Sequence, residues 1–292
     1  LVVFENATSI LPTDTPGRGL IDFGDIYEFQ VAQMFHEEEL ENNLKYVIDK
    51  LCSLFPKAKG IPVMPKVVSY ENMRNEIVSL DSVPIGFETI SNCVCSYDFN
   101  NLVNLVLYSE PSHAQGFQVP LIRVLQKIEN IKIIWIDSLD VSVEIDGLRR
   151  YSSSFGNLCS SLYNSIIEKK SSDATTEKVI FIISGYGKLE KYLKKSKNEN
   201  ESVKTIDDLI VAAIGSENYK FILFESADTK SIDDREWIDY YDYDRGILLA
   251  RDPEEQEIFN VDSSSSSDVK YNRDIATVIN QGLATTIKYM RK

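Results

Sequence analysis

Apolar residues along this chain fall into short, nearly continuous runs that alternate with amphipathic stretches of helical period. Four of these runs predict strands, at 101–108, 131–136, 178–183 and 219–224. A strand buried on both faces shows this uninterrupted apolar pattern, which is typical of a parallel sheet. Helices are predicted in between, at about 117–129, 155–170 and 204–215. This alternation of strands and helices predicts a doubly wound α/β domain with a mostly parallel central sheet.

The residues before this domain follow a different pattern. A turn is predicted at 15–20, a strand at 26–31, and a helix at 37–55 whose apolar residues share one face. A connector containing Pro56, Pro62 and Pro65 follows, and a new strand region opens at Val83. We therefore expect an N-terminal β-plus-helix extension and connector over residues 1–82, and the main domain over residues 83–292.

After the four strong strands, the pattern predicts further strands at 247–250 and 257–261 and a final helix at 274–290. Between the last strand and this helix lies a run of five serines, 263–267, which is typical of a mobile loop.

The segment after the first strong strand can be compared with a phosphate-binding loop. Laid over G-x-x-x-x-G-K-[ST], residues 109–116 place Ser109 and Ala114 at the glycines, Gln115 at the lysine and Gly116 at the magnesium-binding hydroxyl. Glycines allow backbone N–H groups to wrap around phosphate, because any Cβ obstructs that approach. The lysine supplies a positive charge, which a neutral glutamine cannot replace. The sequence predicts a nucleotide site that has been lost from its fold.

A second nucleotide motif is also changed. ATPases of the phosphate-loop type need an acidic pair at the end of another strand, one carboxylate for magnesium and one to polarise water. The third strong strand ends instead in Ser184 and Gly185. Asp137, at the end of the 131–136 strand, is either a substitute acid or an ordinary turn former. Glu225 ends the next strand, where it would repel a γ-phosphate.

Composition narrows the function further. The chain has 45 acidic and 31 basic residues and a formal charge of −14, which makes it a poor general binder of nucleic acid. The lysine-rich stretch 188–197 is either a basic stripe or, more simply, a solvated helix face. No run of about 18 apolar residues occurs, so no membrane span is predicted. Because the chain begins at Leu1 without a methionine, we expect it to be part of a longer protein.

Cysteines and histidines are too few for a metal centre. Cys93 and Cys95 could form half of a zinc site, but there is no second pair, and the histidines are His36 and His113. The irregular spacing of the four cysteines, which include Cys52 and Cys159, fits reduced thiols better than a disulfide framework.

One acidic and aromatic segment is a candidate interaction surface. Residues 231–243 interleave five acidic residues with Trp237, Tyr240, Tyr241 and Tyr243. Aromatic side chains with a polar handle are typical anchors of protein interfaces. The alternative is a solvated acidic loop whose tryptophan packs into the core.

Four short motifs, in their order along the chain, carry a resemblance to a known family. They are Pro-Gly-Arg-Gly-Leu at 16–20 with Tyr-Glu-Phe-Gln at 27–30, Val-Pro-Ile-Gly-Phe at 83–87, Gly-Ile-Leu-Leu-Ala-Arg-Asp-Pro at 246–253, and Gln-Glu-Ile-Phe-Asn-Val at 256–261. Together they resemble the modules of FtsK/SpoIIIE-type ATPases, and specifically the C-terminal ATPase-like module of the coupling proteins of type VII secretion.

The resemblance implies a RecA-like fold of the P-loop NTPases, in tandem modules at the cytoplasmic face of the cell membrane. It also implies partners: neighbouring ATPase modules of the same chain, and secreted substrates such as helical hairpins of the WXG type and toxins. ATP and magnesium are expected at the neighbouring modules, and no cofactor is expected at this one.

Three functions remain open at this point. The first is a non-hydrolysing module that recognises secreted proteins and regulates its neighbours. The second is a weak nucleotide binder that uses the amides at the start of the helix after residue 116, near Pro120. The third is a DNA translocase, which the acidity of the chain disfavours.

Overall fold

The computed structural model describes residues 18–22, 26–30, 40–54, 64–73, 76, 78–139, 143–170, 177–262 and 271–291. The chain divides into two compact units, Leu1–Ile61 and Pro62–Lys292. Several features predicted from the sequence lie outside the described residues: turn residues 15–17, the first residues of the predicted helix (37–39), most of the proline connector and serine run 263–267. The boundary between residues 82 and 83 stays a prediction.

The first unit contains a hairpin and a helix. β1 (Arg18–Asp22) pairs antiparallel with β2 (Ile26–Gln30), and α1 spans Leu40–Leu54. The strand and the helix predicted here are confirmed. Three residues of the apolar stripe of α1 remain 44–49% exposed, namely Leu44, Ile48 and Leu51.

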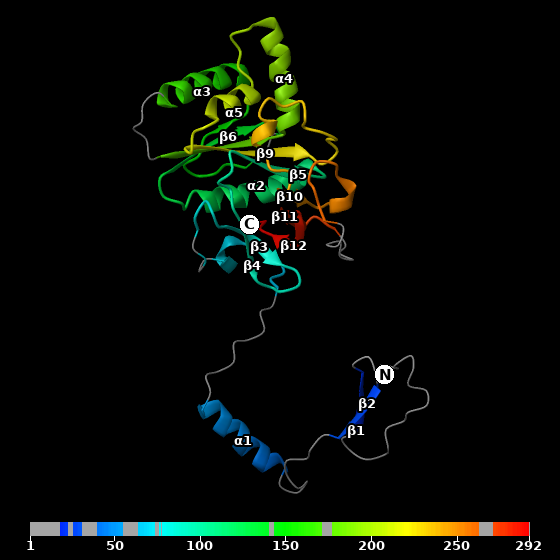
Figure 1. The fold of residues 1–292 in the computed structure, drawn as a ribbon. Helices are drawn as coiled ribbons and strands as arrows, with labels where there is room; N and C mark the ends of the chain where they lie inside the picture. Colours follow the sequence, from blue (N-terminus) through cyan, green and yellow to red (C-terminus); the bar gives the residue numbers. More distant parts are fainter. Residues whose placement is uncertain are drawn as a thin grey trace. The chain divides into compact units, whose positions relative to one another are not determined.

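The second unit is built on one sheet of ten strands, in the order β4-β3-β12-β11-β10-β5-β9-β8-β6-β7 (Figure 1). The six strands from β10 to β7 are parallel to one another, and the other four are antiparallel. The predicted α/β class with a mostly parallel sheet is confirmed. The bounds are β3 Val83–Glu88, β4 Val94–Tyr97, β5 Val103–Tyr108, β6 Ile131–Asp137, β7 Arg150–Tyr151, β8 Lys178–Ser184, β9 Tyr219–Ser226, β10 Arg245–Leu249, β11 Ile275–Asn280 and β12 Leu283–Tyr289.

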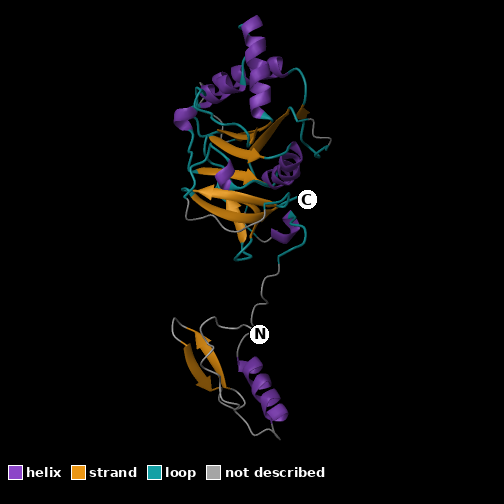
Figure 2. Ribbon diagram, turned by 90° about the vertical axis from the view of Figure 1, so that its right-hand side faces the viewer, coloured by secondary structure: helices purple, strands orange, loops and turns teal. Residues whose placement is uncertain are grey.

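Helices cover both faces of this sheet, which explains why its central strands are apolar throughout. α2 (Pro111–Leu125) packs on one face, and α3 (Phe155–Lys170), α4 (Tyr186–Glu199) and α5 (Ile206–Ala213) pack on the other (Figures 1 and 2). Along β9, for example, Ile222 faces α2, whereas Phe221 and Leu223 face the opposite layer. Short 3₁₀ turns occur at Tyr70–Met73, Ile238–Tyr240 and Pro253–Glu255.

The end of the chain differs from the sequence prediction. The helix predicted at 274–290 is wrong, because these residues form the hairpin of β11 and β12. Gln281 and Gly282 join the two strands with φ values of +52° and +77°, the pair of positive values that a tight hairpin turn requires. β-branched residues such as Ile275, Val278 and Ile279 also favour strands over a helix.

The strand predicted at 257–261 is wrong as well. The side-chain oxygen of Gln256 accepts hydrogen bonds from the backbone N–H groups of Ile258 and Phe259, at 2.8 and 2.6 Å. Its amide nitrogen donates to the carbonyl of Phe259 at 2.9 Å. This glutamine therefore satisfies the backbone locally, and the segment folds as a bent loop that buries Ile258 and Phe259.

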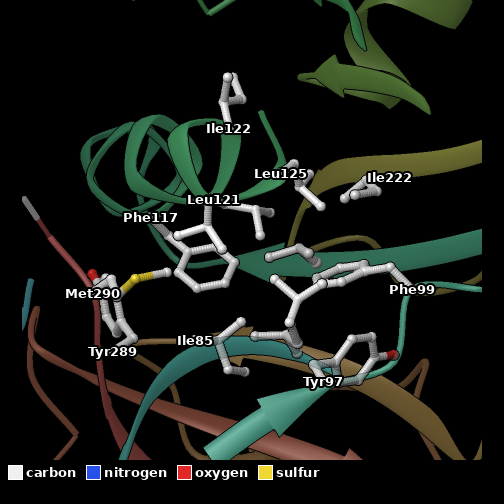
Figure 3. Close-up of a cluster of buried hydrophobic side chains, with 14 of the residues drawn as sticks. Ile85, Tyr97, Phe99, Phe117, Leu121, Ile122, Leu125, Ile222, Tyr289 and Met290 are labelled. Carbon is white, nitrogen blue, oxygen red and sulfur yellow. The ribbon is translucent and has the colours of Figure 1, made fainter. Parts of the chain in front are cut away.

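The core under α2 is centred on Phe117 (Figure 3). Its ring meets the ring of Tyr289 edge-on, with centroids 5.6 Å apart, and lies 6.4 Å from the ring of Phe224. The connector before β3 contributes to the same core through Val68, Met73 and Leu80, all of which are buried.

On the opposite face, a buried polar network joins α4 and α5. Glu190 Oε2 accepts a hydrogen bond from Ile206 N at 2.9 Å, at the start of α5. Asp207 accepts from the hydroxyl of Tyr186 and from Trp237 Nε1, and it forms an ion pair with Lys194 at 2.9 Å. Burial, and then the nearby negative charge of Asp207, raise the pKa of Glu190 from 4.5 to about 7.

This network predicts a distinctive pH dependence of stability. The folded chain keeps the Glu190 proton up to about pH 7, whereas the unfolded chain loses it near pH 4.5. The stabilisation from this proton is therefore complete below pH 4.5 and is lost as the pH rises through about 7. Relative to Glu190→Gln, we expect the wild-type free energy of unfolding to fall by on the order of 1–3 kcal/mol across this range.

Urea unfolding of both proteins at several pH values measures this difference. The opposite slope from His113, whose pKa is lowered by burial, is common to both proteins and cancels. Glu199→Gln, an exposed change at the end of α4, should keep the wild-type profile. Parallel profiles for wild type and Glu190→Gln would contradict the assignment.

Candidate functional site

The connection between β5 and α2 is short. β5 ends at Tyr108 and α2 begins at Pro111, so Ser109 and Glu110 are the only residues between them. The backbone N–H groups of His113 and Ala114 both point to the carbonyl of Glu110, at 2.9 and 3.4 Å. These amides are thus used inside the first turn of the helix, and they do not form a wrapped loop.

Two sequence predictions about this segment are corrected by the structure. Residues 111–116 belong to α2 and are not part of a loop, because Pro111 suits a first helical position and Ala114 and Gln115 are good helix formers. Pro120 lies inside the helix and is buried, instead of lying near its start. His113 is a partly buried residue of this helix.

The four degenerate positions of this segment have structural contacts. The Ser109 hydroxyl donates to the carbonyls of Leu249 and Ala250, at 3.0 and 2.7 Å, and so ties the end of β5 to the end of β10. Ala114 is fully buried in the core under α2. Gln115 Nε2 lies 3.5 Å from the Leu139 carbonyl, directed toward the segment after β6. At Gly116, an added Cβ would lie 3.6 Å from Arg291 Nε, an ordinary contact distance.

Ser184, at the end of β8, is sealed from solvent. Its hydroxyl oxygen accepts hydrogen bonds from Gln118 Nε2 at 2.5 Å and from Trp135 Nε1 at 3.2 Å. Gln118 was missed in the sequence, where its only signal is a polar side chain within the apolar run of α2. A carboxylate at position 184 would meet these two donors and not a metal ion.

Gly185 connects β8 to α4 and is required for two reasons. Its φ of +67° is a conformation that favours glycine, and a Cβ would lie 2.6 Å from the Ser138 hydroxyl oxygen. That hydroxyl donates to the carbonyls of Ser184 and Gly185, at 2.7 and 3.1 Å. The ends of β6 and β8 are therefore fastened together at this point.

Glu225 places its carboxylate at the N-terminal turn of α4. Oε2 accepts from the backbone N–H of Gly187 at 2.5 Å, and Oε1 accepts from Ser226 N at 2.7 Å and from Thr229 Oγ1 at 3.2 Å. The positive end of the helix dipole stabilises this negative charge. The position that an external anion would take at this helix start is thus occupied by a side chain of the protein itself.

A cavity of about 550 Å³ opens at the carboxyl ends of β6 and β8, beside the start of α4. We call it the serine cavity; its lining residues are Asp137, Ser138, Ser152, Ser153, Ser154, Phe155, Lys188, Leu189 and Tyr192. Open α/β sheets bind ligands at this edge. The rings of Phe155 and Tyr192 meet at 78°, with centroids 6.5 Å apart, and Tyr192 is 58% exposed.

Asp137 lies at the floor of the serine cavity and is almost fully buried. Its Oδ1 accepts from Leu139 N at 3.0 Å, and its Oδ2 lies 3.4 Å from Arg150 Nη1. Accepting from the amide two residues onward is the behaviour of a turn-forming aspartate. The turn interpretation therefore accounts for the contacts seen.

The aromatic segment 231–243 is mostly packed inward. Trp237 is fully buried, and its ring lies 6.1 Å from the ring of Tyr186 and 6.0 Å from that of Tyr241, which is 9% exposed. Tyr243 is partly buried and donates its hydroxyl to Asp233 at 2.6 Å. Only Tyr240, at 53% exposure, presents a large surface to a partner. Of the two interpretations, packing into the core describes Trp237.

Within the described part of the chain, no three histidine, cysteine or acidic side chains group as metal ligands. Cys93, Cys95 and Cys159 are free thiols, and burial raises the pKa of Cys159 to about 12. Across the same residues, no helix is long and apolar enough to cross a bilayer.

Comparisons with known proteins identify the fold. No family model matches the chain, and no curated protein matches it in sequence. Among solved structures, the cytoplasmic domain of EssC is similar, with a TM-score of 0.55 and 14% identity over 96% of this chain and 59% of that one. A Thermomonospora curvata EccC fragment (ATPases 2 and 3), in complex with a signal sequence peptide, has a TM-score of 0.54 and 16% identity over 97% and 54%.

The conjugation coupling protein TcpA, solved with ATPγS, is also similar, with a TM-score of 0.54 and 12% identity over 86% of this chain and 82% of that one. The chain thus spans a little over half of the EssC and EccC structures. These similarities show a RecA-like ATPase fold, shared with the type VII secretion ATPases. The predicted fold and resemblance are confirmed at that level.

Two helical glycines test how this site is built. Gly187→Ala would place a Cβ 2.4 Å from Glu225 Oε2, so we expect the free energy of unfolding to fall by about 1–3 kcal/mol. Gly116→Ala meets only ordinary contacts within a helix, so we expect a gain of about 0.5–1 kcal/mol. Chemical denaturation of the two variants measures both. A large loss from Gly116→Ala would show that position 116 needs the freedom of a loop glycine.

Proposed function

We propose that this chain is an ATPase-like module that does not hydrolyse ATP. Its role would be to recognise secreted proteins and to regulate neighbouring ATPase modules of a parent secretion protein. The observation that carries the proposal is the two-residue connection between β5 and α2. Phosphate binding at this place needs a run of free backbone N–H groups. Here Pro111 has no N–H, and the amides of His113 and Ala114 are bonded to the Glu110 carbonyl.

Electrostatics support the same conclusion. Glu110 precedes α2, and its carboxylate accepts from Ser112 Oγ at 3.3 Å, so negative charge lies beside the helix start. Pro111, the first helical residue, has no N–H to offer. A triphosphate brought here would lose its hydration without gaining a cradle of amides, and Arg291, the cation beside Gly116, is already paired with Asp274. We therefore assign ATP and magnesium to neighbouring modules of the parent chain and none to this one.

The partner is proposed from the chemistry of the serine cavity together with the solved complexes. One similar protein, EccC, was solved with a signal sequence peptide. In this chain, the serine cavity combines an aromatic wall, three consecutive serines and the exposed Lys188. Serine hydroxyls can pair with peptide backbone groups, and amphipathic aromatic rings are frequent binding anchors. We propose that a segment of a secreted substrate, a helical hairpin or a toxin, binds in this cavity.

α4 connects the serine cavity to the buried polar network with α5, so binding in the cavity could affect the rest of the module. Its first turns supply Lys188, Leu189 and Tyr192 to the cavity wall, and its middle supplies Glu190 and Lys194 to the network with α5. A substrate that contacts α4 in one arrangement better than in another would shift the population of arrangements. Regulation of the neighbouring modules, at the cytoplasmic face of the membrane, would follow from that shift.

The first test is nucleotide turnover and binding. We expect no ATP hydrolysis above background, and in calorimetry with Mg-ATP a Kd of roughly 1 mM or weaker. The double variant Gln115→Lys with Gly116→Ser should behave in the same way, because position 115 points toward Leu139 and the amides remain in the helix. A hydrolysing ATPase serves as the positive control.

Three results would speak against this proposal or for another function. Hydrolysis that disappears on substitution of Gln115 or Ser184 would overturn the proposal. Mg-ATP binding clearly tighter than about 1 mM without turnover would favour the nucleotide-binding alternative. Salt-dependent binding of duplex DNA, measured separately, would favour a translocase.

The second test concerns the serine cavity. We expect Tyr192→Ala to weaken binding of a secreted substrate by about tenfold or more, as loss of an aromatic anchor does. Tyr46→Ala removes a similarly exposed tyrosine, on α1, and serves as the matched control. Fluorescence anisotropy with labelled substrates measures both. Equal affinity for Tyr192→Ala and wild type, or no binding of any substrate by the wild type, would contradict the assignment.

A further inference from the structure

A second cavity, of about 290 Å³, is lined by no residue of either nucleotide motif, although its Arg291 also lies beside Gly116. Its walls are the segment before β3, the residues that precede β11 and the end of β12. We call it the basic cavity; its lining residues are Lys66, Val67, Val68, Arg273, Asp274, Lys288, Tyr289 and Arg291. Four of these are cationic and one is acidic, in a chain whose formal charge is −14. The sign of the local charge is thus opposite to that of the whole chain.

Most of this positive charge is not neutralised within the described part of the chain. Arg291 forms an ion pair with Asp274. Lys288 donates to two neutral acceptors, the carbonyls of Pro65 at 2.8 Å and Lys66 at 2.7 Å, which leaves its charge uncompensated. Lys66 and Arg273 form no ion pair among the described residues. Like charges held together repel one another, so a bound anion would relieve that repulsion.

The cations are placed by the fold and not only by flexible side chains. Arg291 N donates to the carbonyl of Val68 at 3.0 Å, which closes the cavity between the two segments. Tyr289 donates its backbone N–H to the carbonyl of Asp274 at 3.2 Å and its hydroxyl to that of Arg273 at 2.5 Å. The three walls are therefore bonded to one another through backbone groups. Because the backbone of this site is already ordered, ligand binding loses little conformational entropy there.

We propose that the basic cavity binds a phosphate dianion, either free or as the monoester of a small organic group. Four cations against one carboxylate favour an ion with two charges over a single carboxylate. The volume and the side chains of Val67 and Val68 leave room for a compact apolar or sugar part. None of the residues 109–116 lines this cavity, so the proposed site has its own set of residues, although Arg291 and Tyr289 also neighbour Gly116. The proposal goes beyond substrate recognition.

Calorimetry with the whole chain at low ionic strength tests the proposal. The probes are inorganic phosphate, AMP, adenosine and acetate. We expect phosphate to bind with a Kd on the order of 1 mM or tighter, and adenosine and acetate to bind far more weakly. AMP binding more tightly than phosphate identifies a monoester site, whereas equal affinities identify a site for the free ion.

Charge-removing variants locate the site. Arg273→Gln and Lys66→Gln each remove one exposed cation, so both should fold and weaken phosphate binding by about tenfold. Arg123→Gln removes an exposed arginine at the end of α2, outside the cavity, and should leave binding unchanged. Thermal melts verify the fold of each variant. If Arg273→Gln proves unstable, the phosphate affinity of Lys66→Gln alone tests the location of the site.

Three outcomes would overturn the proposal: no phosphate binding at about 10 mM, acetate binding as tight as that of phosphate, or equal weakening by Arg123→Gln. Because none of these readouts measures ATP turnover or substrate binding, failure here is distinguishable from failure of the proposed function.

Discussion

The short connection from β5 to α2 constrains the rest of this module. A helix that starts at Pro111 commits the amides of His113 and Ala114 to the carbonyl of Glu110. It also sets the faces of the residues that follow: Phe117 enters the core against Tyr289, and Gln118 reaches Ser184 at the end of β8. Opening a loop here would disturb both contacts. The packing of the helix and the absence of a phosphate cradle are thus two consequences of one backbone arrangement.

At the carboxyl ends of β6, β8 and β9, contacts within the protein likewise take the place of contacts with a ligand. Glu225 supplies a carboxylate to the start of α4, and Ser138 bonds the ends of β6 and β8 together. The serine cavity opens at this edge, and it is lined by residues of α4 and by none of α2. The module therefore keeps an open cavity at the sheet edge where α/β folds typically bind ligands. This cavity lies at the ends of β6 and β8 and not at the end of β5.

Much of the fold was predictable from the sequence because burial on both faces leaves a direct pattern. Strands β5, β6, β8 and β9 were predicted from their apolar runs, and α3 was predicted with the bounds that the structure shows. The final hairpin was not predicted, because the apolar and polar residues of 274–290 do not alternate with a clear period of two. Its turn also depends on a positive φ at Gln281, a conformation that is uncommon for this residue type. The loop prediction at 109–116 failed because the comparison with a phosphate-binding pattern outweighed the helix-forming tendency of the residues themselves.

Contacts between residues distant in sequence account for the rest. Gln118 and Trp135 lie 66 and 49 positions from the serine they cover, and no local pattern links them. The cations of the basic cavity are likewise scattered from Lys66 to Arg291. Such sites depend on how the strands are ordered in the sheet, and the sequence predicts strands more readily than their order.

The most direct measurement of the central claim is an experimental structure of the module determined in the presence of Mg-ATPγS. The account predicts a helix that begins at Pro111, Glu225 still bonded to the Gly187 amide, and no nucleotide at the end of β5. An ordered nucleotide between Tyr108 and Phe117, with the first turns of α2 unwound around its phosphates, would contradict it.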